Sequence, residues 1–285
     1  MGHGQSDMTP QQAAAALAWL AEMGADEVIG EMAIDRFQAV VPLPSSRRTP
    51  GPMVEPERAS IAAERSEMGP GLRLPSGQAR RWNDGYGRTA AECHTLEDIA
   101  AALSVFDACP LKKTATNLCF ADGNPAAHVM LIGEAPGREE DIAGKPFVGR
   151  SGQLLDRMLA AIGLSRAAVE PEKSVFITNT IFWRPPGNRD PTEAETAMCL
   201  PFLLRAIEIQ QPKFIVCAGK IPSQRLLATT VGILKLRGRW REFNVGGRSI
   251  ALLPTLHPAY LLRRPADKRY AWRDLLMLRQ ALDAH

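Results

Sequence analysis

The stretch GEAPGREEDIAGKPFVGRSGQLLDRML, from Gly133 to Leu159, decides how this chain is expected to fold. It follows the apolar run 128–132 and passes from a predicted strand, through a turn rich in glycine, proline and acidic residues, into a helix that begins near Ser151. Open α/β sheets bind their ligands on loops at the carboxyl ends of strands. We therefore expect chemistry on this loop.

Four short apolar runs recur along the chain, with helical patterns between and after them. The runs are HVMLIG, SVFITNTI, KFIVCAG and SIALLPTL, and the helical patterns lie at about 151–163, 193–210, 219–229 and 266–283. Strands that alternate with helices are typical of a parallel sheet covered on both faces. GRWREFNVGGRS, with Gly246 and Gly247 at its turn, predicts a hairpin before the last run. We predict a three-layer α/β/α sandwich around a central, mainly parallel four-stranded sheet.

The sequence ahead of this pattern has a different character. QQAAAALAWLAEM predicts a helix over about 10–23, whereas the following Pro-, Gly- and Arg-rich sequence has little periodicity. Thr95 and Asp98 form a variant of the capping box before LEDIAAALSVF. The expected organisation is an N-terminal helical extension (1–39), a linker (40–88) and a folded domain (89–285).

Composition excludes some classes of protein. The net charge of +3 is only mildly basic, so any nucleic-acid surface must come from local clustering of arginines. No apolar run approaches the roughly 20 residues that span a bilayer, and the first residues do not resemble a signal peptide, so we expect a cytoplasmic protein without membrane segments. Five cysteines without a compact disulfide spacing indicate reduced thiols or metal ligands.

Three polar motifs follow strand ends and should meet at one rim of the sheet. They carry Phe147, Asn179 and His257. A flat aromatic face can stack on a heterocycle, an amide offers a donor and an acceptor to a base edge, and an imidazole can hydrogen-bond a carbonyl oxygen. Together they fit a pyrimidine pocket, although each residue taken singly also has a purely structural explanation.

The loops around this rim carry further candidates. Acidic residues of the first loop could position water or stabilise a cationic sugar, but spacing alone does not assign a base. An apolar pair, Leu261 and Leu262, could wedge into a base stack or simply pack at a helix start. The proline-rich loops present four arginines to phosphates, namely Arg184, Arg189, Arg263 and Arg264.

With these motifs the chain resembles the family-4 uracil-DNA glycosylases. The match runs from about Phe106 to Pro265 and rests on GEAPGREEDIAGKPFVGRSGQLLDRML, on NT followed by RPPGNRDPTEAE and CLPFL, and on LHPAYLLRRP. The resemblance implies a uracil-DNA glycosylase fold and excision of uracil from single- or double-stranded DNA during base excision repair, with the base flipped into the pocket. It implies a monomer that works on nucleoid DNA in the cytoplasm.

The resemblance also implies individual roles. Phe147 would stack on uracil, Asn179 would read its N3/O4 edge and His257 would face O2, with Gly133 and Ala135 lining the base. Two acids join His257 as catalytic candidates: Glu140 would lie near C5 and exclude a methyl group, and Glu134 would orient water. Leu262 and the four arginines would contact DNA.

One departure concerns an iron–sulfur cluster. The family pattern has four cysteine ligands, and the corresponding positions here are Phe106, Cys109, Trp183 and Cys199. Two thiolates cannot hold a cluster that normally takes four, so we expect no metal cofactor. We expect Phe106 and Trp183 to pack together in its place. Cys93 and Cys119 could substitute in principle, although neither has the family spacing.

Other functions remain open at this point. A relative with altered base choice would remove other deaminated bases, because pocket shape sets specificity. A non-catalytic protein would bind uracil-containing or abasic DNA with the same rim. Covalent capture of the product by a histidine, known in a related group, is disfavoured because the basic insertion of that group is absent after Gly144.

Overall fold

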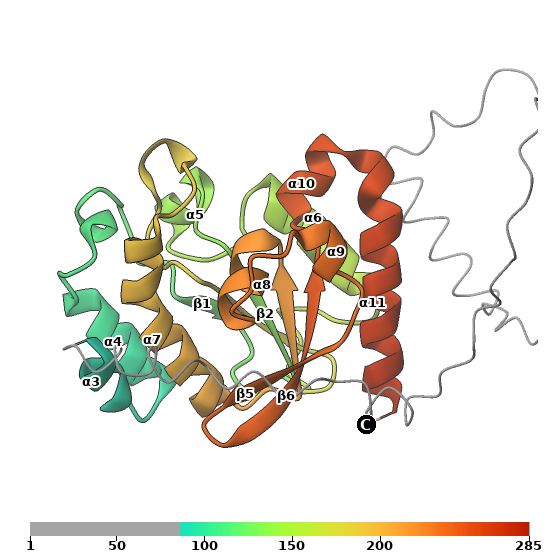
Figure 1. Cartoon of the computed structure of the whole chain (residues 1–285), viewed down its shortest axis with the longest axis horizontal. Helices are drawn as coiled ribbons and strands as arrows, with labels where there is room; N and C mark the ends of the chain where they lie inside the picture. Colours follow the sequence, from blue (N-terminus) through green and yellow to red (C-terminus); the bar gives the residue numbers. More distant parts are fainter. Residues whose placement is uncertain (1–85, 285) are drawn as a thin grey trace, which may run out of the picture.

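A six-stranded sheet forms the middle layer of residues 86–284, the part of the chain that the computed structural model describes (Figure 1). The strand order is β1-β3-β2-β4-β6-β5. The four inner strands are parallel, and the two edge strands pair antiparallel with their neighbours. The strands are β1 (Ala121–Gly123), β2 (Val129–Gly133), β3 (Val175–Asn179), β4 (Phe214–Ala218), β5 (Arg241–Val245) and β6 (Arg248–Thr255).

The predicted sheet type is confirmed, but the predicted number of strands is wrong. The four apolar runs form β2, β3, β4 and β6, and β2, β3 and β4 are buried along their whole length. The extra strands lie at the edges. β1 has only three half-buried residues and no apolar run, so its sequence carries no strand signal. β5 is the first arm of the predicted hairpin, whose Gly246 and Gly247 both have positive φ, as a tight hairpin turn requires.

Helices cover both faces of the sheet. All four predicted helical patterns are helices in the structure, and Thr95 caps its helix through a complete capping box with Asp98. Residues 138–143 lie in the stretch predicted as a loop, but they form a short helix. Its N-cap residue, Gly137, has no side chain, and the Glu140 carboxylate accepts the Gly137 N–H in the first turn. The α-helices are α3 (Tyr86–Ala91), α4 (Leu96–Val105), α5 (Arg138–Ala143), α6 (Arg150–Ala160), α7 (Glu193–Gln210), α8 (Lys220–Leu226), α9 (Ile233–Leu236), α10 (Pro258–Arg263) and α11 (Lys268–Asp283).

Alternation along β2 divides the core into two layers. Met130 and Ile132 pack with α4 and α7 on one face, whereas Val129 and Leu131 pack with α6 and α11 on the other. Figure 1 shows α3, α4 and α7 on one side of the sheet and α11 on the opposite side. A strand places successive side chains on opposite faces, so an unbroken apolar run can supply both layers. The α/β/α sandwich is therefore confirmed.

The fold brings several loop starts to one edge of the sheet. From β2 the chain moves outward to β3 and then to the other side of β2, to β4 and β6. The carboxyl end of β2 is thus a topological switch point, where α/β proteins bind ligands. The expected helix at 10–23 and the linker as far as residue 85 lie outside the described residues. The last linker residues, 86–88, and the expected domain start, Thr89, lie within α3, so the folded part begins slightly earlier than predicted. None of the helices described could cross a membrane.

Candidate active site

Gly133 brings two pocket walls together at the end of β2. Its Cα pairs with that of Asn179 at the end of the neighbouring strand. A Cβ on Gly133 would lie 2.3 Å from Asn179 Oδ1 and 2.5 Å from Phe147 Cε2. The amide and the aromatic ring can approach each other only because this residue has no side chain. Thr180 holds the register, since its backbone N–H and its hydroxyl both donate to the Gly133 carbonyl.

Asn179 presents a buried hydrogen-bond acceptor that the described residues leave unused. The residue is 1 % exposed, and its Oδ1 has no hydrogen-bond partner within residues 86–284. A buried polar atom without a partner costs about 1–3 kcal/mol. Such an atom next to an aromatic ring is suited to a ligand that offers an N–H group.

Phe147 has an unusual backbone. Its φ is +53°, a left-handed conformation that costs a bulky residue on the order of 1–3 kcal/mol. The side chain is 4 % exposed, and its ring lies 5.4 Å from the His257 ring, centroid to centroid, at an interplanar angle of 29°. The surrounding structure must hold Phe147 in place, and the two rings form one aromatic wall.

His257 is neutral and has a defined hydrogen-bonding direction. It follows β6 as the N-cap of α10, and its Nδ1 accepts a hydrogen bond from the Ala259 backbone N–H at 3.1 Å. An accepting Nδ1 leaves the ring hydrogen on Nε2. Burial, followed by the nearby Arg263 cation, lowers the His257 pKa to about 4. Near neutral pH the imidazole is therefore an Nε2–H donor without a charge.

Two carboxylates of the first loop have different surroundings. Glu134 follows β2 directly and is partly buried; burial and then the charge of Asp190 raise its pKa, while Lys220 opposes the shift. Glu140 is 7 % exposed and accepts three backbone N–H groups, from Gly137 at 3.1 Å, Val148 at 3.1 Å and Gly149 at 2.9 Å. Glu140 thus ties α5 to the loop that carries Phe147.

Sequence reasoning missed one residue of this site. Gly219, at the end of β4, has a φ of +104°, and a Cβ there would lie 3.1 Å from His257 Cβ. It therefore fixes how closely the imidazole approaches the sheet. The signal available in the sequence is its place as the last residue of the third apolar run, KFIVCAG, directly before the helix that begins at Lys220.

A family model described as the uracil DNA glycosylase superfamily matches residues 120–276. This chain belongs to that superfamily. It is 39% identical to a type-4 uracil-DNA glycosylase of Archaeoglobus fulgidus over 60% of this chain and 85% of the relative. It is 39% identical to one of Saccharolobus solfataricus over 66% and 87%, and 38% identical to one of Thermotoga maritima over 61% and 86%, respectively.

Two of the arginines predicted to contact DNA in this uracil-DNA glycosylase superfamily member lie before α7. Both make hydrogen bonds to other side chains of the chain. Arg184 donates to Asn188 Oδ1 at 2.7 Å. Arg189 donates twice to Glu195, at 2.9 and 2.6 Å, and this bidentate pair lowers the Glu195 pKa to about 2. Such a pair stabilises the start of α7 whether or not nucleic acid is present.

The second predicted DNA-contacting group lies at the end of α10. Arg263 and Arg264 are exposed, and Leu262 is partly buried. Leu261 is fully buried in the core with α6 and α11, so the structure favours packing for Leu261 and leaves Leu262 as the member of the pair nearer the surface.

Ala135, predicted to line the base, is partly exposed, and it packs against the sheet face that α4 and α7 cover.

The four positions that correspond to cluster ligands do not fit an iron–sulfur cluster. The expected packing is confirmed: the rings of Phe106 and Trp183 stack with centroids 6.4 Å apart and an interplanar angle of 15°. Cys109 and Cys199 are buried, and a hydrogen bond between their thiols together with burial raises the Cys199 pKa. Across residues 86–284 no group of three or more Cys, His, Asp or Glu side chains could hold a metal ion.

The two alternative cysteines have their own partners. Cys119 lies 3.1 Å from the Glu140 carbonyl and Cys93 lies 3.4 Å from the Thr89 carbonyl, both as hydrogen-bond donors. Neither thiol joins Cys109 and Cys199 in a set of four ligands. The aromatic packing and these thiols therefore form an ordinary protein core.

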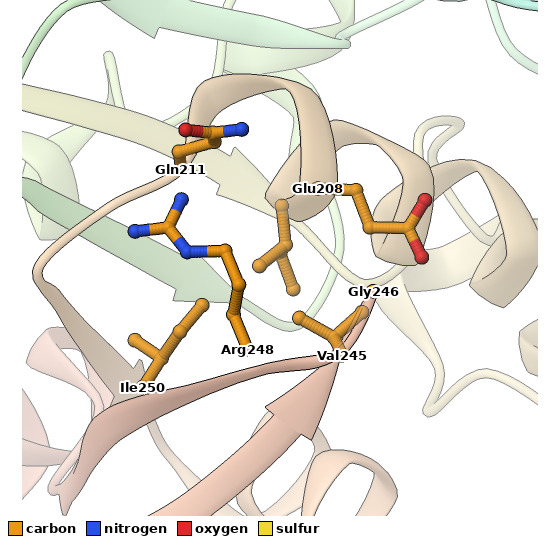
Figure 2. A pocket seen from close by; sticks show the side chains of 7 residues that line it. Glu208, Gln211, Val245, Gly246, Arg248 and Ile250 are labelled. Atoms are coloured by element: carbon orange, nitrogen blue, oxygen red, sulfur yellow. The ribbon is translucent and has the colours of Figure 1, made fainter.

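A small hollow lies away from the site, beside the hairpin turn. It is lined by the end of α7 and by both arms of the hairpin (Figure 2). Its volume is about 60 Å³, well below the roughly 300–1,000 Å³ of usual small-molecule sites. The hollow is therefore too small for a small-molecule site, and the rim where Phe147, Asn179 and His257 meet remains the candidate active site.

Proposed function

We propose that this chain excises uracil from DNA in base excision repair, and that Phe147, Asn179 and His257 form the uracil pocket. The observation that carries the proposal is the convergence of an aromatic wall, an unused buried acceptor and a neutral Nε2–H donor at one switch point. The comparisons support the reaction, since the similar type-4 enzymes are named uracil-DNA glycosylases.

Base recognition follows from the chemistry of uracil. A uracil flipped out of the DNA would lie against Phe147, with its N3–H directed at Asn179 Oδ1 and its O4 accepting from the same amide. Gly133 lets the Asn179 amide and the Phe147 ring approach each other at the end of β2, and Ala135 follows on the next loop. Cytosine lacks the N3–H donor, so it would leave Oδ1 buried and unpaired, which disfavours its binding.

The glycosidic bond breaks with charge developing on both sides. The electron pair of the C1′–N1 bond stays with uracil, whose O2 gains negative charge, while the sugar gains oxocarbenium character. His257 donates its Nε2–H hydrogen bond to O2; its low pKa keeps this group a hydrogen-bond donor and not a general acid at neutral pH. The donor is already oriented before the reaction, because the Ala259 N–H fixes the tautomer.

Glu134 acts on the sugar side in this proposal. Its carboxylate orients a water molecule whose oxygen bonds to C1′ and which gives one proton to that carboxylate; uracil departs as the anion and takes up a proton from solvent, leaving an abasic site. A pKa raised by burial and by Asp190 makes Glu134 a stronger base than an exposed glutamate. Glu140, predicted to lie near C5, already accepts three backbone N–H groups, so we propose that it acts by holding the Phe147 loop.

The DNA-binding surface is proposed to lie beside the pocket. Arg263 and Arg264 are exposed at the end of α10, the helix that His257 caps, where they would contact phosphates, and Leu262 would face the space left by the flipped base. Arg184 and Arg189 would shape the neighbouring loop through their internal bonds. We propose that the protein works as a monomer on nucleoid DNA in the cytoplasm.

We also propose that the protein carries no iron–sulfur cluster. Stacked Phe106 and Trp183 replace two of the four cysteine ligands with aromatic packing, and Cys109 and Cys199 remain as buried thiols. Purified protein should be colourless and free of stoichiometric iron. A brown protein with broad visible absorbance and bound iron contradicts this part of the proposal.

The test of the function is strand cleavage by alkali after incubation with labelled oligonucleotides. Uracil-containing single and double strands should be cleaved at uracil, and Asn179→Ala and His257→Ala should each lower excision by roughly 10²-fold or more, a typical cost of losing such a group. Duplexes that carry hypoxanthine, xanthine or thymine opposite guanine test for altered base choice. Binding of uracil-containing DNA without any cleavage would identify a non-catalytic binder instead.

A further inference from the structure

Arg166 has an unexplained position beside the pocket loop. Its side chain is 15 % exposed, and the steps proposed above give it no part in the reaction. The guanidinium donates to groups on separate elements. Its partners are Asp156 Oδ1 on α6 at 2.8 Å, Asp122 Oδ2 on β1 at 3.1 Å, the Pro146 carbonyl at 3.1 Å and the Phe147 carbonyl at 2.8 Å.

The two carbonyls are the ones that define the backbone of Phe147. The Pro146 carbonyl belongs to the peptide plane before the Phe147 Cα, and the Phe147 carbonyl belongs to the plane after it. The dihedral angles φ and ψ of a residue are the rotations of these two planes about its Cα. By bonding both planes, one rigid guanidinium opposes relaxation of Phe147 out of its left-handed conformation, φ +53°.

Arg166 is itself held in place. Asp122 and Asp156 fix the guanidinium from β1 and α6, and Asp122 also pairs with Lys145 at 3.3 Å. An arginine fork can bond several acceptors in one plane, whereas a lysine ammonium acts as a single point charge. The loop is thus anchored to the sheet and to α6 through one side chain.

The two sides of the loop have separate anchors. Glu140 accepts the N–H groups of Val148 and Gly149, on the side of α5. Arg166 binds the carbonyls just before them. α6 also comes close to this backbone, because a Cβ on Gly152 would lie 1.9 Å from the Phe147 oxygen.

We propose that Arg166 is a positioning residue for uracil excision: it fixes the backbone of Phe147 so that the ring is oriented before the base arrives. The inference rests on the proposed role of Phe147 as the surface on which uracil stacks. Arg166 touches neither the base nor the sugar. Its loss would act on the reaction only through Phe147.

The experiment is a double-mutant cycle read by kcat, KM and inhibition by free uracil. Arg166→Ala should lower kcat/KM by about 10-fold or more and weaken uracil inhibition by a similar factor, because small displacements of a positioned group are costly. In a Phe147→Ala background the same change should alter either value by less than about 3-fold. Arg166→Lys, which keeps a cation beside the two aspartates, should fold normally. Its kcat/KM and its inhibition by uracil should lie between those of the wild type and those of Arg166→Ala.

Arg205→Ala is the matched control. Arg205 likewise donates to a backbone carbonyl, that of Cys93, and to the carboxylate of Glu208, but it lies on α7. It should lower the melting temperature while uracil inhibition stays at the wild-type value. Unchanged inhibition in Arg166→Ala and Arg166→Lys, or fully additive effects in the Phe147→Ala background, overturns the inference. Wild-type activity of Phe147→Ala itself removes the proposed role of Phe147, and the inference with it.

Discussion

Adding one methyl group at Gly133 should displace the side chains that form the proposed uracil pocket. In Gly133→Ala the new Cβ would lie 2.3 Å from Asn179 Oδ1 and 2.5 Å from Phe147 Cε2, whereas real Cβ contacts are essentially never under 3.0 Å. The amide oxygen or the strand must therefore move by about 0.7 Å among closely packed neighbours. Neither the Asn179 amide nor the Phe147 ring can retreat easily, because both are buried.

The size of the effect follows from this displacement. A shift approaching 1 Å in a positioned group costs about 10²-fold in rate, and overpacking of a buried site costs typically 1–3 kcal/mol of unfolding free energy. We expect kcat/KM for a uracil-containing single strand to fall by about 10²-fold. Urea unfolding of the same preparation measures the loss of stability, which should lie in the range above.

Gly232→Ala is the control for the methyl group. Gly232 has an ordinary φ of −68°, and a Cβ there meets nothing within 4 Å. Its kcat/KM should equal that of the wild type. If Gly133→Ala excises uracil within about 3-fold of the Gly232→Ala rate, Gly133 does not line the base, and the geometry assigned to the pocket wall is wrong.

Three further predictions concern pH, packing and DNA. The pKa of His257 is about 4 in the folded protein and ordinarily near 6.5, so the unfolded state binds more protons between these two pH values. The free energy of unfolding should therefore fall by up to roughly 3 kcal/mol as the pH drops from 6.5 to 4. Unfolding curves measured at a series of pH values should show a weaker dependence in His257→Asn. Phe106→Ala should lower the unfolding free energy by about 3–5 kcal/mol, measured in urea, because it opens a cavity beside Trp183 and Phe202. Arg263→Ala should weaken binding of uracil-free duplex DNA and reduce the slope of log affinity against log salt by about 0.9, whereas an unchanged slope means that Arg263 contacts no phosphate.

Much of the scaffold could be predicted because its signals are local. The apolar runs predicted the four parallel strands, and the predicted capping residue Thr95 stands at the start of α4. β1 escaped prediction because three half-buried residues at a sheet edge have no periodicity to read. The short α5 escaped because its cap is supplied by Glu140 and not by the residue at Gly137.

The candidate site was predicted as a set of residues but not as an arrangement. Strand ends place Asn179 and His257 on one rim, and this much follows from the order of the elements. The tautomer of His257 depends on the Ala259 N–H, and the orientation of Phe147 depends on Arg166, which is distant in sequence. Contacts of this kind arise only when the chain is folded, so neither could be predicted from motif spacing.

A crystal structure of the protein with free uracil tests the central claim most directly. The account predicts that the uracil ring stacks on Phe147, that its N3 lies about 2.7–3.2 Å from Asn179 Oδ1, and that its O2 lies within the same range of His257 Nε2. Uracil bound elsewhere, or bound at this rim with Asn179 Oδ1 still unpaired, would contradict the account.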